Sequence, residues 1–376
     1  MVYHRIQSVI LNISMKLFRR PHNWFPRFHE WVHTHRTRTY LLVGIGLVTA
    51  ASLTALVALY RTPVQVATLT TTKQKPKPAP VYYSPLTGEK VPNEAATKQA
   101  VTAIMIENSP DARPQSGIKQ AGVVYEAVAE GGITRFLTIH QQNKPQLIGP
   151  VRSLRMYYVD WLAPYQASVA HIGGSAAALA EVRNGSYRDI DQFFNSGAYW
   201  RATDRYAPHN VYTSFAKLDE LNNSKGYTES SFKSFNRKDG KANETPNATS
   251  IDMNFSSAQY NTHYDYDKAS NTYARSIGGE PSNDREDGRI TPSVVVAIKV
   301  DMTRVLEDGY REDIETTGTG TAYVFQNGAV TECTWRKVDR ASPLELIDID
   351  GNPISLNRGQ TWIGAIPNGA GNVSWT

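Results

Sequence analysis

The feature that most constrains this chain is a long uncharged run near its N-terminus. Residues 40–60 read YLLVGIGLVTAASLTALVALY, 21 residues without a charge. A helix rises about 1.5 Å per residue, so this run can cross a hydrocarbon core about 30 Å thick. Tyr40 and Tyr60 bracket it as interfacial residues do. The run predicts a transmembrane helix; the alternatives are a buried helix of a soluble core and a signal peptide cleaved after Ala58.

The charges around this run predict its orientation. Residues 1–39 form a basic tail with seven Lys or Arg and one acid, Glu30. Basic flanks stay in the cytoplasm, so we expect the N-terminus inside and residues 61–376 outside. Taking seven and one from the totals of 40 basic and 35 acidic residues leaves 33 and 34, a net charge of −1. Nucleic-acid binding requires clustered cations, so we expect no nucleic-acid partner.

Residues 61–230 divide by composition into two parts. Residues 61–82 are rich in Pro, Thr and Lys, which predicts an extended linker. Residues 83–230 alternate between strand-like runs and helix-like segments, which predicts a mixed α/β domain. The strand-like runs are 103–106, 123–128, 135–141 and 168–172. The helix-like segments are 156–165, 175–183 and 214–223.

The C-terminal part has a different pattern. Residues 231–250 are polar and predict a connector between domains, with a long surface excursion of a single domain as the alternative. Residues 251–376 show strands and turns, and Asn327-Gly328 and Asp350-Gly351 are hairpin signals. We expect a small antiparallel β domain there, a barrel or a sandwich, and an α+β or α/β fold class for the body.

The first motif that can carry chemistry is GPVRSLR at residues 149–155. Arg152 and Arg155 are three residues apart at a predicted loop-to-helix junction, so they can point the same way. Guanidinium groups bind carboxylate or phosphate with paired hydrogen bonds. The alternative is a pair of surface arginines that bridge to local acids.

The second motif is HIGGS at residues 171–175. His171 ends a predicted strand, Gly173 and Gly174 make a turn, and Ser175 stands where a helix N-cap belongs. A helix N-terminus can bind an anion, and a serine after a strand can be a nucleophile. Because the spacing is not G-x-S-x-G, we favour a cap with an anion site over a nucleophile.

Two further motifs bring polar groups together. The run at residues 201–210 ends in His209 and Asn210, which are ligand-binding candidates unless they only hold their own loop. Glu126 and Glu130 are expected on one face of a strand, with Arg135 following. They can be an acid/base pair, partners for Arg152 and Arg155, or a structural ion-pair network.

Metal and cofactor chemistry has little support. His140, His171 and His209 lack the spacing of metal ligands, so we expect no metal and no cofactor. A single cysteine, Cys333, excludes an intramolecular disulfide and a cysteine-based zinc site. Because this cysteine is far from the apolar run, no cysteine stands at the end of that run to carry a lipid.

These motifs together resemble the YerB-like family of bacterial lipoproteins, known as DUF3048. The resemblance covers about residues 83–376 and implies an envelope location and two domains, but no reaction. This chain departs from the family in its spanning helix in place of a lipid-bearing cysteine, and in Cys333, where the family pattern has a glycine. The matching segments are SPLTG at 84–88, ENSPDARPQSGIKQAGVVYEAVAEGGITRF at 107–136, GPVRSLRMYYVDWL at 149–162, HIGGS at 171–175, RYAPHNVYTS at 205–214, and the C-terminal run from TGTGTAYVFQNGAVTECTW to GQTWIGAIP.

Three functions follow from these motifs. The first, which we favour, is binding of an anionic cell-wall component in a cleft lined by Arg152, Arg155, His171, the turn at 173–175 and His209. The second is a structural protein that acts through membrane partners. The third is a cell-wall hydrolase or transferase that uses His209 or His171 with Ser175 or Glu130.

Overall fold

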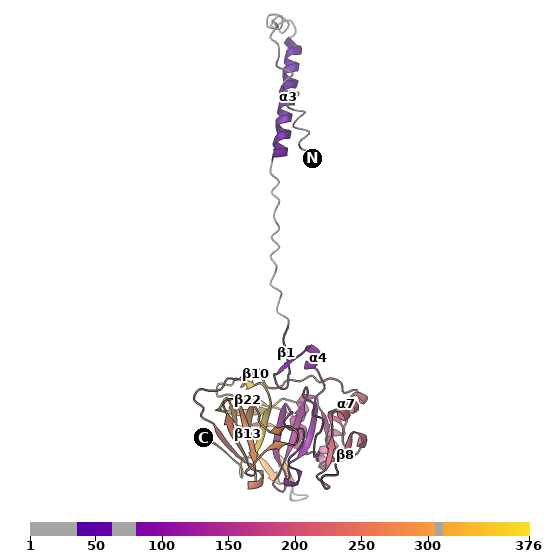
Figure 1. Ribbon diagram of the computed structural model, residues 1–376, viewed down its shortest axis with the longest axis vertical. Helices are drawn as coiled ribbons and strands as arrows, with labels where there is room; N and C mark the ends of the chain where they lie inside the picture. The colour runs from indigo at the N-terminus through magenta and orange to yellow at the C-terminus, as the bar shows by residue number, and fades with distance from the viewer. Residues whose placement is uncertain (1–35, 62–79, 305–310) are drawn as a thin grey trace. The chain divides into compact units, whose positions relative to one another are not determined.

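The computed structural model describes residues 36–61, 80–304 and 311–376. The chain divides into two compact units, Met1–Pro78 and Ala79–Thr376 (Figure 1). In the first unit, α3 (Arg36–Arg61) contains the stretch Tyr40–Ala58, whose mean hydropathy is 2.2. Among the described helices it alone is long and apolar enough to span a membrane. The predicted tail up to residue 35 and the linker at 62–79 lie outside the described residues.

A ten-stranded sheet runs through the second unit, which we call the body. Its strands, in order across the sheet, are β22 (Glu345–Ile347), β21 (Ala329–Lys337), β20 (Gly318–Gln326), β17 (Val294–Val300), β24 (Thr361–Pro367), β4 (Val123–Glu130), β5 (Ile133–His140), β3 (Thr102–Glu107), β6 (Ser168–Ala170) and β7 (Arg188–Asp189). Strand β24 pairs in parallel with β4, so Ile363 lies opposite Tyr125. The predicted α/β and β-rich parts of the chain therefore share one sheet.

A second sheet packs on one face of the first. Its order is β14 (Glu280–Pro281), β13 (Thr272–Ile277), β12 (Thr262–Asp267), β11 (Ser250–Asn254) and β25 (Asn372–Trp375). Ile104, Val124 and Trp362 from the large sheet pack with Ile251 and Tyr264 from the small one. This apolar layer is one of the two cores of the body, because burial of such side chains is the main driving force for packing.

Short helices contribute to both cores. Tyr157 and Trp161 of α5 pack in the core on the other face of the large sheet, where Trp161 stacks on Tyr125 with ring centroids 5.2 Å apart. Phe215 of α7 belongs to the same apolar cluster as the small sheet and lies against His140 of β5. The helices of the body are α4 (Glu94–Thr97), α5 (Met156–Leu162), α6 (Ala176–Val182) and α7 (Phe215–Ser224). The 3₁₀ turns are η1 (Pro110–Ala112), η2 (Ala163–Tyr165), η3 (Ser196–Ala198) and η4 (Ala258–Tyr260).

Paired short strands complete the body. Strand β10 lies inside the predicted connector at 231–250 and pairs in parallel with β23, which ties that segment to the C-terminal part. These strands are β1 (Tyr82–Tyr83) with β2 (Lys90–Val91), β8 (Tyr199–Arg201) with β9 (Val211–Thr213), β10 (Arg237–Lys238) with β23 (Leu356–Asn357), β15 (Asn283–Asp284) with β16 (Gly288–Arg289), and β18 (Met302–Arg304) with β19 (Glu312–Ile314).

Most elements predicted from local pattern are present. The four strand-like runs correspond to β3, β4, β5 and β6, and the three helix-like segments to α5 with η2, α6 and α7. Asn327 and Gly328 turn between β20 and β21 with φ of 61° and 73°, as a two-residue hairpin requires. Strands β17 and β24 pair in parallel, which departs from the antiparallel pairing predicted for the C-terminal part.

Candidate functional site

Three segments meet where β3 ends. The N–H of Glu107 donates to the carbonyl of Pro150 at 2.9 Å, and the N–H of Val151 donates to the carbonyl of Val211 at 2.7 Å. The segment that carries Arg152 is thereby held between the end of β3 and the start of β9. Because His209 stands two residues before β9, this backbone pairing brings three side chains together that are far apart in sequence: Glu107, Arg152 and His209.

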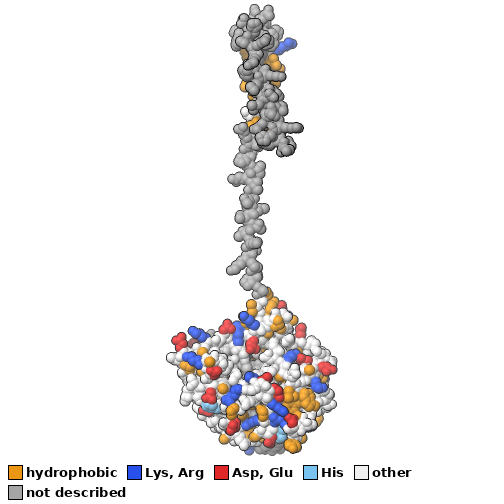
Figure 2. All heavy atoms as spheres, viewed as in Figure 1, with side chains coloured by type: hydrophobic (Ala, Val, Ile, Leu, Met, Phe, Trp, Pro, Cys, Tyr) orange, Lys and Arg blue, Asp and Glu red, His pale blue; other side chains and the backbone are white. Residues whose placement is uncertain are grey.

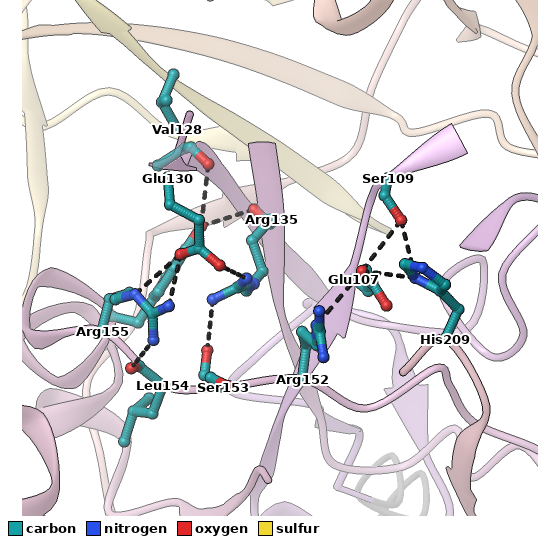
Figure 3. Close-up of polar contacts among 12 residues, drawn as sticks. Glu107, Ser109, Val128, Glu130, Arg135, Arg152, Ser153, Leu154, Arg155 and His209 are labelled. Carbon is teal, nitrogen blue, oxygen red and sulfur yellow. Dashed lines mark hydrogen bonds and ion pairs between the residues drawn. The ribbon is translucent and has the colours of Figure 1, made fainter. Parts of the chain in front are cut away.

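We call Glu107, Ser109, Arg152 and His209 the Glu107 cluster (Figure 3). Oε1 of Glu107 accepts a hydrogen bond from Ser109 Oγ at 3.0 Å and lies 2.9 Å from His209 Nδ1 and 3.3 Å from Arg152 Nε. The glutamate is only 3% exposed, yet no described donor reaches its other oxygen, Oε2. Arg152 and His209 keep about a quarter of their side chains exposed, at 25% and 22%. One edge of this cluster therefore faces solvent.

A cavity of about 530 Å³ lies beside His209. Arg205 donates to the backbone carbonyls of Asp111 at 2.8 Å and Pro114 at 2.6 Å, and Arg285 pairs with Asp204 at 2.6 Å. Within the described parts of the chain, no carboxylate lies within ion-pair distance of Arg205. The cavity therefore contains one guanidinium that forms no ion pair within the described residues, although the pKa of the neighbouring Asp204 is lowered by its hydrogen bond from Arg285 and also by the charge of this guanidinium. It is lined by Asp111, Asp204, Arg205, Tyr206, His209 and Arg285.

The second group of charges, the Glu130 cluster, consists of Glu130, Arg135 and Arg155 (Figure 3). Arg135 Nη2 lies 2.6 Å from Glu130 Oε1, and Arg155 Nη2 lies 2.5 Å from Oε2. Arg135 Nη1 donates to the carbonyl of Ser153 and Arg155 Nη1 to that of Leu154, whereas the buried Nε of Arg135 has no partner among the described residues. Both arginine side chains are less than 10% exposed. This cluster is a buried ion-pair network that joins β4 and β5 to the start of α5.

Burial and charge act against each other in this network. Burial alone raises the pKa of Glu130, but the charges of Arg135 and Arg155 outweigh it and lower the pKa below its ordinary value. Burial, together with the neighbouring Arg135, lowers the pKa of Arg155. A single carboxylate thus pairs with two guanidinium groups, which leaves the cluster a net charge of +1, and the ionised form of Glu130 is favoured.

Glu126 lies on the opposite face of β4 from Glu130. A bulge between Val128 and Glu130 shifts the register, so the two glutamates do not share a face as predicted. Glu126 is fully buried between the two sheets, where Arg275 Nη2 lies 2.8 Å and Trp362 Nε1 lies 2.9 Å from its Oε2. Arg275 comes from β13, so this buried pair connects the N-terminal and C-terminal parts of the body.

The predicted pairing of the two motif arginines is wrong. Arg152 turns to Glu107 and Arg155 to Glu130, so they do not point the same way. The reason is that Arg155 is the N-cap residue of α5 and faces the end of β4, whereas Arg152 lies in the preceding extended segment. Of the predicted cleft, Arg152 and His209 are brought together, and Arg155 belongs to the other cluster.

The HIGGS turn is internally satisfied. His171 is fully buried, with Nδ1 2.7 Å from the carbonyl of Gly173 and Nε2 3.0 Å from Asp189. Gly173 has φ of +61°, and a Cβ at Gly174 would lie 3.0 Å from the carbonyl of Leu154, which explains both glycines. Ser175 caps α6 by accepting from the N–H of Ala178, as predicted. The anion site at the N-terminus of α6 stays a prediction.

The other candidates also have structural partners. Asn210 accepts from Arg201 at 2.7 Å and donates to the carbonyl of Ala202, so it holds its own loop. His140 is fully buried against Phe215, and burial lowers its pKa to about 3. Within the described residues, no group of three His, Cys, Asp or Glu side chains is arranged to hold a metal.

Sequence reasoning missed several residues of these sites. Glu107 and Ser109 stand in the ENSPDARPQSG segment. The available signal was a glutamate at the last position of a strand, followed directly by Asn-Ser-Pro. Arg205 stands in the run at 201–210 that was singled out for His209 and Asn210. No local signal indicates Arg275, because its partner Glu126 is 149 residues away in sequence.

Comparisons with known proteins agree with the motif resemblance. The model described as "Protein of unknown function (DUF3048) N-terminal domain" matches residues 86–228, and the DUF3048 C-terminal domain matches residues 251–363. The chain is 33% identical over 299 residues, 78% of this chain and 88% of the relative, to "Putative lipoprotein YerB" of Bacillus subtilis (strain 168). The crystal structure of YerB protein from Bacillus subtilis matches with a TM-score of 0.71 and 30% identity, covering 78% of this chain and 99% of that one.

Proposed function

The chain belongs to the DUF3048 family, and from this premise we propose that it is a membrane-anchored envelope protein that binds an anionic ligand in the cavity beside His209. The relative from Bacillus subtilis carries the name of a lipoprotein, which places a protein on a membrane surface by a lipid. In this chain, α3 takes the place of the lipid as the anchor.

The anchor is supported by length and charge. The stretch Tyr40–Ala58 has the hydropathy of a spanning helix, and the basic residues before it favour a cytoplasmic N-terminus. The body then lies outside the cytoplasm, among cell-wall components. Lys, Arg, Asp and Glu side chains are interspersed over the face of the body seen in Figure 2. Such a surface does not attract polyanions as a whole, so an anion must be recognised at a local site.

One observation carries the ligand class: the guanidinium of Arg205 lines the cavity and bonds only to neutral carbonyl oxygens. The other arginine of the cavity, Arg285, is neutralised by Asp204. A guanidinium that forms no ion pair favours binding of a carboxylate or phosphate group, with which it forms charge-assisted hydrogen bonds. His209 lies on the same wall and is oriented by Glu107. An acidic group of a cell-wall component fits this combination.

The geometry is less suited to a hydrolase. In a serine triad, the acid and the hydroxyl group contact opposite nitrogens of the histidine ring. Here Glu107 and Ser109 both lie beside Nδ1 of His209, at 2.9 and 3.2 Å. Ser109 is buried as well. His171 has both ring nitrogens facing protein oxygens, and Ser175 is a helix cap.

Thermal unfolding of the full chain in detergent, with inorganic phosphate and with muropeptides, tests the proposal. We expect a saturable rise in melting temperature, because a ligand that binds only the folded state stabilises it by about 2.7 kcal/mol at roughly 100 times its Kd. The rise should be lost in Arg205→Gln. The rise should be kept in Arg336→Gln. This change removes an exposed guanidinium of β21 from its ion pair with Glu345 of β22.

The absence of a saturable rise with every compound would contradict ligand binding at this cavity. It would favour the second candidate, a protein that acts through partners. One observation supports that candidate: Phe193 and Phe194 are 67% and 72% exposed on the turn after β7, where large apolar side chains can dock on another protein.

A further inference from the structure

A second cavity, of about 370 Å³, lies on the other side of the loop that carries Asp111. It is formed where the loop from Pro110 to Pro114 meets the strands β13 to β15 of the C-terminal part. The single cation among its lining residues is Arg113, and the acid among them, Glu280, is exposed. The cavity is lined by Pro110, Arg113, Pro114, Gln115, Gln259, Ile277, Gly278, Glu280, Pro281, Ser282 and Asn283.

Arg113 resembles Arg205 in its bonding. Its Nη2 donates to the carbonyls of Asn108 at 3.0 Å and Gln259 at 3.1 Å, and its Nε donates to Oδ1 of Asn108 at 3.2 Å. The guanidinium also lies over the ring of Tyr260 at 5.4 Å. All these partners are uncharged. Within residues 80–304 and 311–376, no carboxylate lies within ion-pair distance of Arg113.

The nearest buried acid does not compensate this charge. Asn108, which accepts from Arg113, donates through its amide to Thr134 at 2.6 Å and to Glu126 at 3.4 Å. Glu126, however, is already paired with Arg275 at 2.8 Å. Arg113 is therefore fixed in position by neutral groups at the edge of a neutralised ion pair. A guanidinium held in this way is preorganised to bind an external anion.

The two cavities are lined by neighbouring residues of the same two segments, 110–115 and 280–285. Asp111 lines the cavity beside His209 and Arg113 lines the second one, and residues two apart have Cα atoms at most about 7 Å apart. In the second segment, Asn283 lines the second cavity and Arg285 lines the cavity beside His209, with Asp284 between them. The N–H of Arg285 donates to the carbonyl of Gln115, which holds the two segments together. Adjacent acidic groups of one extended ligand can therefore reach both cavities.

We propose that Arg113 forms a second anion subsite, and that the ligand is a chain molecule with repeated acidic groups that lies across the loop from Pro110 to Pro114. This inference rests on the proposed function, since the first acidic group binds beside Arg205. Two sites on one rigid body raise the affinity for a linked ligand, because the second contact is intramolecular. The structure thus favours an acidic polymer over a small acid.

Titration calorimetry of the full chain in detergent, with inorganic phosphate, triphosphate and long-chain polyphosphate, tests the second subsite. Oligoglutamates of matched length distinguish carboxylate from phosphate chemistry. We expect the longer chains to bind roughly 10²-fold more tightly than the single acidic group. In Arg113→Gln this gain with length, which is the ratio of the affinity for the longer chains to that for the single acidic group, should fall to about one. In Arg336→Gln the ratio should be the same as in the parent protein.

Arg113 also supports its loop, so a second variant protects the test from a folding defect. Asn283→Asp adds a carboxylate to the same cavity without removing a side-chain contact, and it should also abolish the gain with length. If inorganic phosphate binds but the gain is the same in all four proteins, the second subsite is wrong and the proposed function stands. If no acidic compound binds the parent protein, both proposals are wrong.

Discussion

The Glu107 and Glu130 clusters each centre on a glutamate paired with one arginine of the GPVRSLR motif at the same end of the sheet, yet they differ in how far they are closed to solvent. Strands β3 and β4 both pair antiparallel with β5, so they run the same way, and each ends in a glutamate. Glu130 uses both oxygens on two arginines that are less than 10% exposed. Glu107 uses one oxygen, and its partners Arg152 and His209 remain about a quarter exposed.

This difference separates a structural role from a binding role. Groups that are removed from water need partners inside the protein, and in the Glu130 cluster both carboxylate oxygens are used on buried arginines, although one carboxylate and two guanidinium groups leave a net charge of +1. In the Glu107 cluster, water can still solvate Arg152 and His209, and the neighbouring cavity contains Arg205, which forms no ion pair within the described residues. Motif residues in the closed cluster therefore connect the fold, whereas we propose that those in the open cluster are available to a ligand.

The largest effect is expected from Glu130→Gln. This change removes the carboxylate and leaves Arg135 and Arg155 buried without a counter-charge, so the free energy of unfolding should fall by about 3 kcal/mol. Chemical denaturation measures it, and Glu286→Gln, at an exposed glutamate, should cost less than about 0.5 kcal/mol.

The acid dependence of the same pair of proteins checks the cause. Because the pKa of Glu130 is lowered in the folded state, its stabilisation is present above the ordinary value of 4.5 and is lost as the pH falls through the folded value. The difference between the parent and Glu130→Gln should therefore shrink below pH 4.5. A difference that is constant across this range would mean that packing, and not charge, stabilises the cluster.

The local features of both clusters were predictable, and their connections were not. The strand β4, the helix α5 and the cap at Ser175 follow from patterns within a few residues, which is the range over which propensity and capping act. The parallel pairing of β24 with β4 joins segments more than 200 residues apart, and no periodicity within either segment encodes it. The bulge at Val128 changes which face Glu130 occupies, so alternation alone placed Glu126 and Glu130 together.

A smaller effect is expected from Glu107→Gln, although Glu107 is the more buried of the two glutamates. The amide oxygen can still accept from Ser109, and solvent reaches Arg152 and His209, so the loss should be about 1 kcal/mol. Chemical denaturation beside Glu130→Gln compares the two clusters directly. If Glu107→Gln costs as much as Glu130→Gln, the Glu107 cluster is also a closed structural network, and the proposed binding role loses its basis.

The smallest effect is expected at a third cluster, which lies outside both. On the small sheet, His263 contacts Asp252 through Nδ1 at 2.8 Å and Asp265 through Nε2 at 3.1 Å, and all three side chains are more than a third exposed. Burial alone lowers the pKa of His263, but the hydrogen bonds to Asp252 and Asp265 outweigh it and raise the pKa above 6.5. Because the folded pKa is raised, the stabilisation is fully present below pH 6.5 and is lost as the pH rises through the folded value.

Solvent screening keeps this contribution below about 1 kcal/mol. Melting temperatures of the parent and His263→Gln, compared from acid to alkaline pH, should therefore converge as the pH rises, the opposite of the trend at Glu130. Added salt should also reduce the stability difference between the parent and His263→Gln more than that between the parent and Glu130→Gln. The reason is that salt screens exposed charges much more than buried ones. Equal salt sensitivity at the two positions would show that exclusion of solvent does not distinguish the charge clusters of this protein.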